Sequence, residues 1–270
     1  MPELPELETI LNKIKVHLID NIIKRIIVRK NNLRYVVPLE IINIYNKKIL
    51  NIKRKGKYLL IRLNHGWIII HLGMTGNLFI LHKYISPTTH DHIDIILKNN
   101  IILRYNDPRR FGSWTWIKKI KDSNLLLKLG IEPLSNKLSH NYLFKKFKNK
   151  KTYIKSWIMN NKNITGIGNI YANEILFAAK ISPQRAVNSL TKKEIIYLIK
   201  KIKNILQSAI NYGGTTIKNF LQPDQQTKGF FVKQLSVYGK KDQICTYCKH
   251  KIQFIKINQR STYYCKYCQI

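Results

Sequence analysis

All four cysteines of the chain lie near its C-terminal end, as two Cys-x-x-Cys pairs. Their order is Cys245-x2-Cys248-x16-Cys265-x2-Cys268, which lies inside the spacing expected for a four-cysteine zinc site. Two such pairs joined by a hairpin form a closed tetrahedral S4 set, so we expect one structural Zn2+ rather than a catalytic one. A pair of unmetallated redox motifs is the alternative. Arg260 lies on the same hairpin, where the metal would fix its position.

The overall charge indicates a polyanionic partner. The 270 residues include 48 Lys and Arg but only 14 Asp and Glu, which gives a net charge of +34. Such a surplus repels itself unless a polyanion neutralises it, so we expect nucleic acid, with a membrane surface as the alternative. No apolar stretch is long enough to span a bilayer or to form an export signal. With no cysteine left for disulfides, we expect a cytoplasmic protein. The sequence gives no sign of oligomerisation, so a monomer is the default.

The first eight residues, Met-Pro-Glu-Leu-Pro-Glu-Leu-Glu, hold three of the 14 acidic residues. Removal of Met1, which is usual before proline, would leave Pro2 with a free secondary amine. An α-amino group has a pKa of about 7.7–8.0 against about 10.4 for lysine, so it offers on the order of 100-fold more neutral amine at neutral pH. Such an amine can attack an electrophilic carbon and form a Schiff base, with Glu3 as general acid.

Taken alone, these eight residues favour an ordinary helix start. Pro5 in the first turn, acidic residues beside it and an apolar stripe beginning at Leu7 predict a helix over about residues 5–18. The charges of this segment alone do not separate the two interpretations.

Short runs of β-branched and aromatic residues follow the predicted helix. We expect strands over residues 22–28, 58–63, 66–72, 93–97, 101–105 and 114–117. Asn99-Asn100 is a two-residue hairpin signal between two of them. Many short strands separated by turns predict an antiparallel sandwich or barrel, and we place this domain at residues 1–131.

The pattern becomes helical after a Gly- and Pro-containing linker at residues 130–135. Helices are expected over residues 139–147, 152–160, 169–179 and 191–211. The last has Thr191 as its cap with Glu194 at capping-box spacing, and Gly213-Gly214 ends it. We assign residues 132–222 to a helical domain, and residues 223–270 to a polar loop (222–230) followed by the cysteine module.

Three further motifs have both a functional and an ordinary interpretation. The turn at residues 165–171 opens a helix whose amides can bind a DNA phosphate, with Lys151 and Lys155 upstream, although glycine turns between helices are common. Met74, Arg109 and Phe111 stand in two turns and resemble wedges pushed between bases, or else they are core and solvated residues.

His90-Asp91-His92 suggests a metal, but further ligands are scarce, so His90 is expected to meet phosphate or to lie on the surface. Lys57, in Lys53-Arg54-Lys55-Gly56-Lys57, is a solvated cation by default.

Taken together, these residues resemble formamidopyrimidine-DNA glycosylase over essentially the whole chain. Each motif is modest alone, and their shared order is specific. The motifs that carry the resemblance are Pro2-Glu3-Leu4-Pro5-Glu6, Lys57-Tyr58-Leu59-Leu60, His71-Leu72-Gly73-Met74-Thr75-Gly76, His90-Asp91-His92, Asp107-Pro108-Arg109-Arg110-Phe111-Gly112, Gly168-Asn169-Ile170-Tyr171-Ala172, Gly213-Gly214-Thr215-Thr216, and the cysteine module with Gln259-Arg260.

The resemblance implies an α+β multidomain fold: an N-terminal antiparallel β-sandwich with an N-terminal helix, then a helix–two-turn–helix domain with a four-cysteine zinc hairpin. It implies a bifunctional enzyme that excises oxidised purines, chiefly 8-oxoguanine and formamidopyrimidines, and then cuts the abasic site by β,δ-elimination. The partner would be double-stranded DNA with the lesion opposite cytosine, bound in the cleft between the domains, in the cytoplasm and at the nucleoid.

The resemblance also assigns roles to individual residues. Pro2 would be the nucleophile, Glu3 the proton donor, Lys57 an aid to β-elimination and Arg260 an aid to δ-elimination. The loop at 222–230 would close over the flipped base. Met74, Arg109 and Phe111 would fill the vacated space, with Arg109 facing the cytosine. Glu6 would lie near the base or the Pro2 amine, and the remaining positions that map to DNA contacts are His90, Lys151, Lys155, Asn169 and Tyr171.

Two rival interpretations remain. Endonuclease VIII shares the amine chemistry but prefers oxidised pyrimidines; Leu4 and the Met74, Arg109 and Phe111 set favour the purine enzyme. A zinc-ribbon nucleic-acid-binding protein without catalysis accounts for the charge and the cysteines, but it leaves the acidic N-terminus unexplained.

Overall fold

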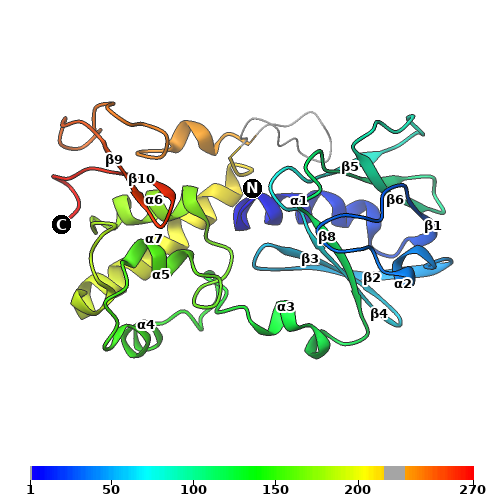
Figure 1. Cartoon of the computed structure of the whole chain (residues 1–270), viewed down its shortest axis with the longest axis horizontal. Coiled ribbons are helices and arrows are strands. Elements are labelled where there is room, and N and C mark those ends of the chain that lie inside the picture. Colours follow the sequence, from blue (N-terminus) through cyan, green and yellow to red (C-terminus); the bar gives the residue numbers. More distant parts are fainter. Residues whose placement is uncertain (1, 216–228) are drawn as a thin grey trace. The chain divides into compact units, whose positions relative to one another are not determined.

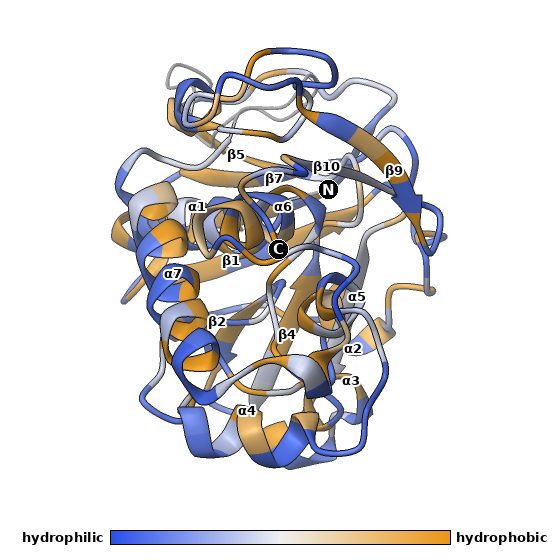
Figure 2. Ribbon diagram, turned by 90° about the vertical axis from the view of Figure 1, so that its left-hand side faces the viewer, coloured by the Kyte–Doolittle hydropathy of each residue, from blue (hydrophilic) through white to orange (hydrophobic). Residues whose placement is uncertain are grey.

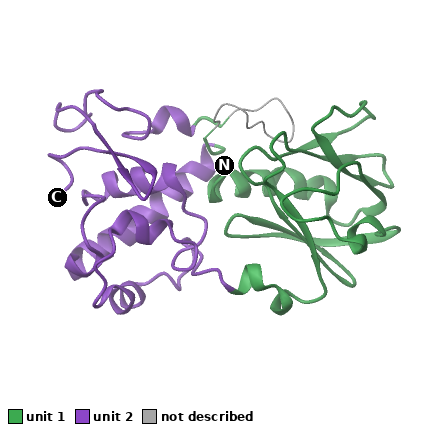
Figure 3. Ribbon diagram, viewed as in Figure 1, with its two compact units in different colours: residues 1–127, 213–230 green, residues 128–212, 231–270 purple. Residues whose placement is uncertain are grey.

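The computed structural model describes residues 2–215 and 229–270. The chain forms two compact units (Figure 3). Unit 1 contains the described residues up to Leu127 together with 213–215 and 229–230, and unit 2 contains Lys128–Tyr212 and Phe231–Ile270. The predicted three-part division at residues 131 and 222 is a different scheme and stays a prediction.

Unit 1 is built on one eight-stranded antiparallel sheet in the order β5-β7-β6-β1-β2-β3-β4-β8 (Figure 1). Its strands β1 and β2 share only the register pairs Ile22↔Lys48 and Ile23↔Lys47, so the sheet divides into two four-stranded halves. The strands are β1 (Ile22–Val28), β2 (Lys47–Lys55), β3 (Tyr58–Leu63), β4 (Gly66–His71), β5 (Asn77–Leu81), β6 (Asp91–Leu97), β7 (Ile102–Asn106) and β8 (Ser113–Ile117).

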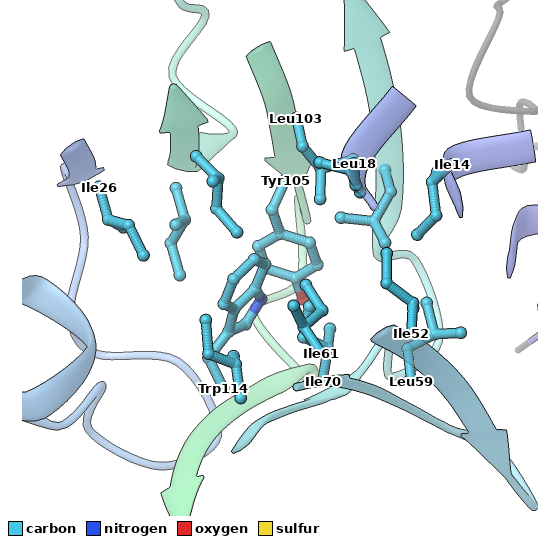
Figure 4. Packing of buried hydrophobic residues seen from close by; sticks show 14 of the residues in the cluster. Ile14, Leu18, Ile26, Ile52, Leu59, Ile61, Ile70, Leu103, Tyr105 and Trp114 are labelled. Atoms are coloured by element: carbon cyan, nitrogen blue, oxygen red, sulfur yellow. The ribbon is translucent and has the colours of Figure 1, made fainter. Parts of the chain in front are cut away.

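The core of unit 1 lies between these halves, which confirms the predicted sandwich architecture. Figure 4 shows Leu103 and Tyr105 on one side facing Ile61, Ile70 and Trp114 on the other. All five side chains are fully buried. Burying an aliphatic side chain of this size contributes about 1.5–3 kcal/mol, so the isoleucine- and leucine-rich strands contribute strongly to the stability of unit 1.

Two strands were not predicted from the sequence. In β2, only Ile49 and Ile52 are buried, and the register shifts between Ile49 and Asn51. A bulge inserts one residue and so breaks the period of two on which strand prediction depends. The many lysines of β2 hide the remaining signal, while β5 is only five residues long.

The N-terminal helix α1 (Leu4–Leu18) packs against β2 and β3. Its buried positions Leu7, Ile10, Leu11, Ile14 and Leu18 recur at helical spacing. The helix begins one residue earlier than predicted, so Pro5 occupies its second position, where a missing N–H is equally harmless. The short elements α2 (Leu39–Ile42), η1 (Ile120–Asp122) and α3 (Asn124–Leu127) complete unit 1.

Unit 2 contains the predicted helices and the cysteine hairpin. Its elements are α4 (His140–Phe147), α5 (Ile154–Met159), α6 (Asn169–Ala178), η2 (Val187–Ser189), α7 (Lys192–Asn211), η3 (Phe231–Gln234), β9 (Gln253–Ile257) and β10 (Arg260–Tyr264). Helix α6 is buried almost throughout, and α7 presents an apolar face to it and a polar face outward (Figure 2).

The predicted capping box of α7 is present: Thr191 Oγ1 accepts from Glu194 N, and Thr191 N donates to the Glu194 carboxylate. Among the described residues, no helix has the length and apolarity needed to cross a membrane.

Candidate functional site

The start of α1 holds the predicted nucleophile and general acid together. Pro2 is buried and directly precedes Glu3, the extended N-cap residue of the helix, which is 4% exposed. Glu6, three residues on, accepts a hydrogen bond from Glu3 N at 2.8 Å. This is the backbone half of a capping box, and it fixes the peptide that follows Pro2. The helix-start interpretation and the catalytic one are therefore compatible, because the start of the helix holds Pro2 and Glu3 in place.

Glu6 also joins the N-terminus to a distant segment of unit 1. Its Oε1 accepts from both the N–H and the hydroxyl of Thr215, each at 2.8 Å. Gly214 has φ +78°, and a Cβ there would lie 3.0 Å from Glu6 Oε1. The glycine therefore allows the chain to approach the carboxylate. From the sequence, we expect Glu6 near the base or the Pro2 amine, and no role for Thr215 is predicted; the Gly213-Gly214-Thr215 motif was the available signal.

The predicted loop at residues 222–230 lies outside the described residues, apart from Gly229 and Phe230. Phe230 forms an isolated antiparallel bridge with Thr215. A Cβ on Gly229 would lie 2.2 Å from Gly214 O. The backbone of Gly229 therefore packs directly against the backbone of Gly214, next to the contact between Glu6 and Thr215.

Lys57 is buried rather than solvated, so its default interpretation is wrong. It follows Gly56, whose φ of +57° makes the tight turn between β2 and β3, and it is 6% exposed.

His71 lies close to Lys57. Burial lowers the pKa of His71 to about 4, with the charges of Lys57 and Arg34 acting in the same direction. His71 is therefore a neutral ring at pH 7, and its Nδ1 accepts from Gly73 N at 3.1 Å.

Met74, Arg109 and Phe111 lie together at the surface of unit 1. Arg109 Nη1 is 3.6 Å from Met74 Sδ, and its guanidinium carbon lies 4.4 Å from the centre of the Phe111 ring. Met74 is 48% exposed and Phe111 44%, so neither is a core residue. With Arg34 and His71 they line a pocket of about 570 Å³. An exposed apolar pair around a planar cation suits insertion into stacked bases.

The His90-Asp91-His92 motif is not a metal site in the described part of the chain, where the cysteines form the only candidate cluster. His90 is exposed, as expected for a surface or phosphate-contacting residue. His92 is 3% exposed, and its Nε2 lies 2.8 Å from Asp107 O.

In unit 2, two of the residues predicted to contact DNA, Lys155 and Asn169, also support β10. The Lys155 ammonium, 1% exposed, donates to Ser261 O at 2.8 Å and to Thr262 Oγ1 at 2.7 Å. Asn169, the first residue of α6, donates through Nδ2 to Ser261 O at 3.0 Å. The buried Lys155 ammonium therefore lies against β10 rather than on the surface, and we assign it a supporting role.

Tyr171 is fully buried, with its ring 5.8 Å from that of Phe231, so its side chain belongs to the core of unit 2. Lys151 is exposed and remains available to a phosphate.

Arg260 is exposed and begins β10, directly after a turn in which Asn258 and Gln259 have φ of +46° and +60°. Asn258 Nδ2 donates to Ser156 Oγ at 3.0 Å, which ties this turn to α5. Arg260 and Lys155 help to line a pocket of about 220 Å³. The contacts of the hairpin with α5 thus fix the backbone from which Arg260 extends.

The four cysteines fit a zinc ion. Their sulfur atoms all lie within 4.8 Å of one another, with Cys248 Sγ 3.3 Å from Cys265 Sγ and Cys245 Sγ 3.8 Å from Cys268 Sγ. Four Zn–S bonds of about 2.3 Å in a tetrahedron require sulfur separations of about 3.8 Å. The set is closed by protein ligands, so a bound Zn2+ would be structural.

Glu174, which was not predicted from the sequence, anchors the chain that leads into this module. Its carboxylate accepts from Ser236 N at 2.7 Å, Val237 N at 3.0 Å and Tyr238 N at 2.8 Å. Burial raises the pKa of Glu174, while these three N–H groups favour its charge. A glutamate inside an apolar helix was the signal that could have revealed it.

Comparison with known proteins agrees with this geometry. Residues 1–114 match the formamidopyrimidine-DNA glycosylase N-terminal domain, and residues 129–221 match the H2TH domain of the same enzyme. Formamidopyrimidine-DNA glycosylase of Proteus mirabilis is 48% identical over 269 residues, covering 100% of this chain and 98% of the relative.

Two solved structures of Lactococcus lactis Fpg are similar along the whole chain. One is a mutant in complex with Fapy-dG-containing DNA (TM-score 0.91), and the other is a complex with abasic-site-containing DNA (TM-score 0.90). Each is 30% identical and covers 99% of both chains. The chain thus belongs to the formamidopyrimidine-DNA glycosylase family of bifunctional DNA glycosylases and abasic-site lyases.

Proposed function

We propose that this enzyme removes 8-oxoguanine and formamidopyrimidines opposite cytosine from duplex DNA, through a Schiff base on Pro2, and then cleaves the abasic site by β,δ-elimination. The observation that carries the proposal is the pairing of buried Glu3 with Pro2 at the end of a helix whose Glu6 fixes the intervening backbone. The exposed Met74, Arg109 and Phe111 cluster of the same unit supports action on a duplex.

Access to the sugar requires the damaged nucleotide to leave the stack. Unstacking and unpairing cost a few kcal/mol, which side chains inserted into the vacated space offset. Met74 and Phe111 supply apolar surface for this purpose. Arg109 supplies planar donors that match the acceptors of an unpaired cytosine.

The chemistry begins when the neutral Pro2 nitrogen attacks C1′ and the glycosidic bond breaks. The electron pair of that bond leaves with the base, which takes up the proton that the Pro2 nitrogen gives up as it bonds to C1′. Glu3 donates a proton to the sugar ring oxygen, so the ring opens and a cationic iminium joins Pro2 to C1′. The positive nitrogen acidifies the C2′ hydrogens.

Loss of a C2′ proton expels the 3′ phosphate, and a second elimination expels the 5′ phosphate. We assign Lys57 to the first step, because it is buried in the turn before β3, in the same unit as Pro2. We assign Arg260 to stabilisation of phosphate in the second, because it projects from the supported hairpin of unit 2. His90, Lys151 and Asn169 are proposed to contact the DNA backbone, with Asn169 also bracing β10.

A zinc ion held by the four cysteines would cross-link the two ends of the hairpin that carries Arg260. Its contribution is to the fold of this module and not to bond breaking, because no ligand position is left open. A monomer acting on chromosomal DNA in the cytoplasm completes the proposal.

A comparison of excision rates on two lesions tests the proposal against the endonuclease VIII alternative. The same duplex would carry either 8-oxoguanine opposite cytosine or thymine glycol opposite adenine, and single-turnover excision rates would be compared. Faster release of 8-oxoguanine is the expected result. Faster removal of thymine glycol would overturn the purine assignment and leave the amine chemistry in place.

A further inference from the structure

A buried carboxylate joins the two turns that carry Met74, Arg109 and Phe111. Asp107 is fully buried. Its Oδ1 accepts from Thr75 Oγ1 at 2.5 Å, and its Oδ2 accepts from Tyr105 Oη and from Gly112 N, both at 2.9 Å. A carboxylate accepts hydrogen bonds and donates none, so it satisfies all three donors at once. One side chain therefore holds the 73–76 turn, the end of β7 and the 107–112 turn.

Thr75 extends this connection to Arg109. The Thr75 hydroxyl donates to Asp107 and accepts from Arg109 N at 3.3 Å. Thr75 also directly follows Met74 in the chain. The Asp107–Thr75–Arg109 series thus runs from a buried acid to the backbone of the exposed arginine.

The two turns also pack against each other without space for a side chain. Gly73 has φ +63°, and a Cβ there would lie 2.4 Å from the carbonyl carbon of Phe111. A Cβ on Gly112 would lie 1.9 Å from Tyr105 Oη. Burial, followed by the charge of Asp107, raises the pKa of Tyr105, so its hydroxyl stays a donor at any physiological pH. The turns therefore form a single unit of backbone and hydrogen bonds.

We propose that Asp107, acting through Thr75, is a positioning residue that holds Met74, Arg109 and Phe111 as one preassembled wedge and thereby sets discrimination of the base opposite the lesion. This inference rests on the proposed function, in which Arg109 meets the orphaned base. Asp107 touches neither the reacting sugar nor the base.

The physical reason is that base discrimination by a side chain on a turn requires a fixed backbone. Arginine presents its donors in a rigid planar fork. The match between that fork and the edge of a nucleobase is lost when the arginine backbone shifts. Sites on turns are less accurate than sites on helices or strands unless a supporting shell holds them. Asp107, between the end of β7 and β8, supplies that support from the sheet.

Thr75→Val tests the connection, with Thr75→Ser as its matched control. Valine keeps the shape of threonine but removes both hydrogen bonds, whereas serine keeps the hydroxyl. Thr75 is partly exposed and lies in a turn, so both variants are expected to fold. Asp107→Asn is the second variant, with its melting temperature measured alongside; Thr75→Val decides the matter if that protein does not fold.

The readout is dissociation constants for duplexes that carry a stable abasic-site analogue opposite cytosine or opposite adenine, together with excision of 8-oxoguanine from both contexts. Thr75→Val should lower the preference for cytosine over adenine about tenfold, the effect of one lost hydrogen bond to a charged group. Thr75→Ser should retain the wild-type preference. Borohydride trapping on a single-stranded abasic oligonucleotide, which needs no wedge, should not change.

A wild-type ratio in Thr75→Val would overturn the inference. So would an equal loss in both contexts and on the single strand, because that pattern indicates general damage to the fold. Failure of the proposed function is a separate outcome: a wild type that binds the analogue with a preference for cytosine but excises nothing would refute excision and leave the wedge inference standing.

Discussion

The Glu6 carboxylate accepts two hydrogen bonds from Thr215, which lies 209 residues further along the chain, and a third from the N–H of Glu3. The backbone beside the nucleophile is therefore fixed by a residue from the far end of unit 1. A carboxylate is needed here because both of its oxygens act as acceptors at 3% exposure.

Glu6→Gln should disturb this arrangement on one side only. A glutamine amide can accept from Thr215 through its oxygen, but its NH2 group faces the Glu3 N–H donor. We expect excision to slow by about 10-fold to 100-fold, the effect of an unsatisfied buried donor. Thr215→Val is the matched variant, since it removes one bond and leaves the other two. Single-turnover rates measure both, and an unchanged rate in Glu6→Gln would contradict the assignment.

Glu3→Gln should separate the two activities. Excision needs a proton on the sugar oxygen, so we expect it to fall by about 10²–10⁴-fold, the usual contribution of a general acid. A pre-formed abasic site already carries an aldehyde, and Pro2 can condense with it without that proton. Trapping on abasic DNA should therefore persist within a few-fold of wild type. Equal loss of both activities would instead mean that Glu3 mainly holds the fold.

Lys155→Met should affect unit 2 while leaving the amine chemistry intact. The substitution removes a buried ammonium that binds Ser261 and Thr262, so β10 loses its support and Arg260 its fixed position. We expect a fall in stability of about 1–3 kcal/mol and accumulation of the β-elimination product. Denaturant melts and product gels measure these effects.

Lys151→Met is the control for Lys155, because Lys151 is exposed. It should weaken DNA binding and lower the salt slope by about one, without changing the product pattern. If both variants behave in this way, Lys155 is a surface phosphate contact and the buried role is wrong.

Zinc removal should damage the hairpin selectively. Cys265→Ser or treatment with a strong chelator removes the cross-link between the two Cys-x-x-Cys pairs, so we expect loss of duplex binding and of δ-elimination. Trapping on a single-stranded abasic oligonucleotide should continue, since Pro2 and Glu3 belong to unit 1. Metal analysis should give one zinc per chain before treatment. A metal-free protein with full duplex activity would exclude a structural ion.

Acidification should destabilise the fold through His71. Burial lowers its pKa to about 4 from a usual value of 6.5, so between these values the unfolded chain binds more protons than the folded one. The free energy of unfolding should therefore fall as the pH decreases from about 6.5 to 4, by up to on the order of 3 kcal/mol. In His71→Asn, whose Oδ1 can still accept from Gly73 N, this part of the pH dependence should disappear. Denaturant melts across this range provide the test.

The sequence was most informative where pattern and local chemistry agree. The apolar stripe of α1, the capping box at Thr191 and the cysteine spacing each depend on a few neighbouring residues, and all three are found in the structure. The hairpin at Asn99-Asn100 also forms, with φ of +65° at Asn100. Strand β2 was missed because a bulge breaks its period.

Long-range partners could not be predicted in the same way. Lys57 and Lys155 look like two more lysines in a lysine-rich chain, and only the fold shows that they are buried. Asp107 stands within the Asp107–Gly112 motif, but no role was predicted for it or for Glu174 from the sequence. Their hydrogen-bond partners are backbone groups or hydroxyls on other elements, and such partners leave no trace in local composition.

The central claim, covalent catalysis by the Pro2 amine, is tested most directly by borohydride reduction during reaction with an 8-oxoguanine duplex, followed by peptide mapping of the adduct. The wild type should give a protein–DNA species joined at the Pro2 nitrogen, with Met1 absent. Pro2→Leu, in which the bulky second residue keeps Met1 in place, should give none. An adduct on a lysine, or an equal yield from Pro2→Leu, would contradict the account.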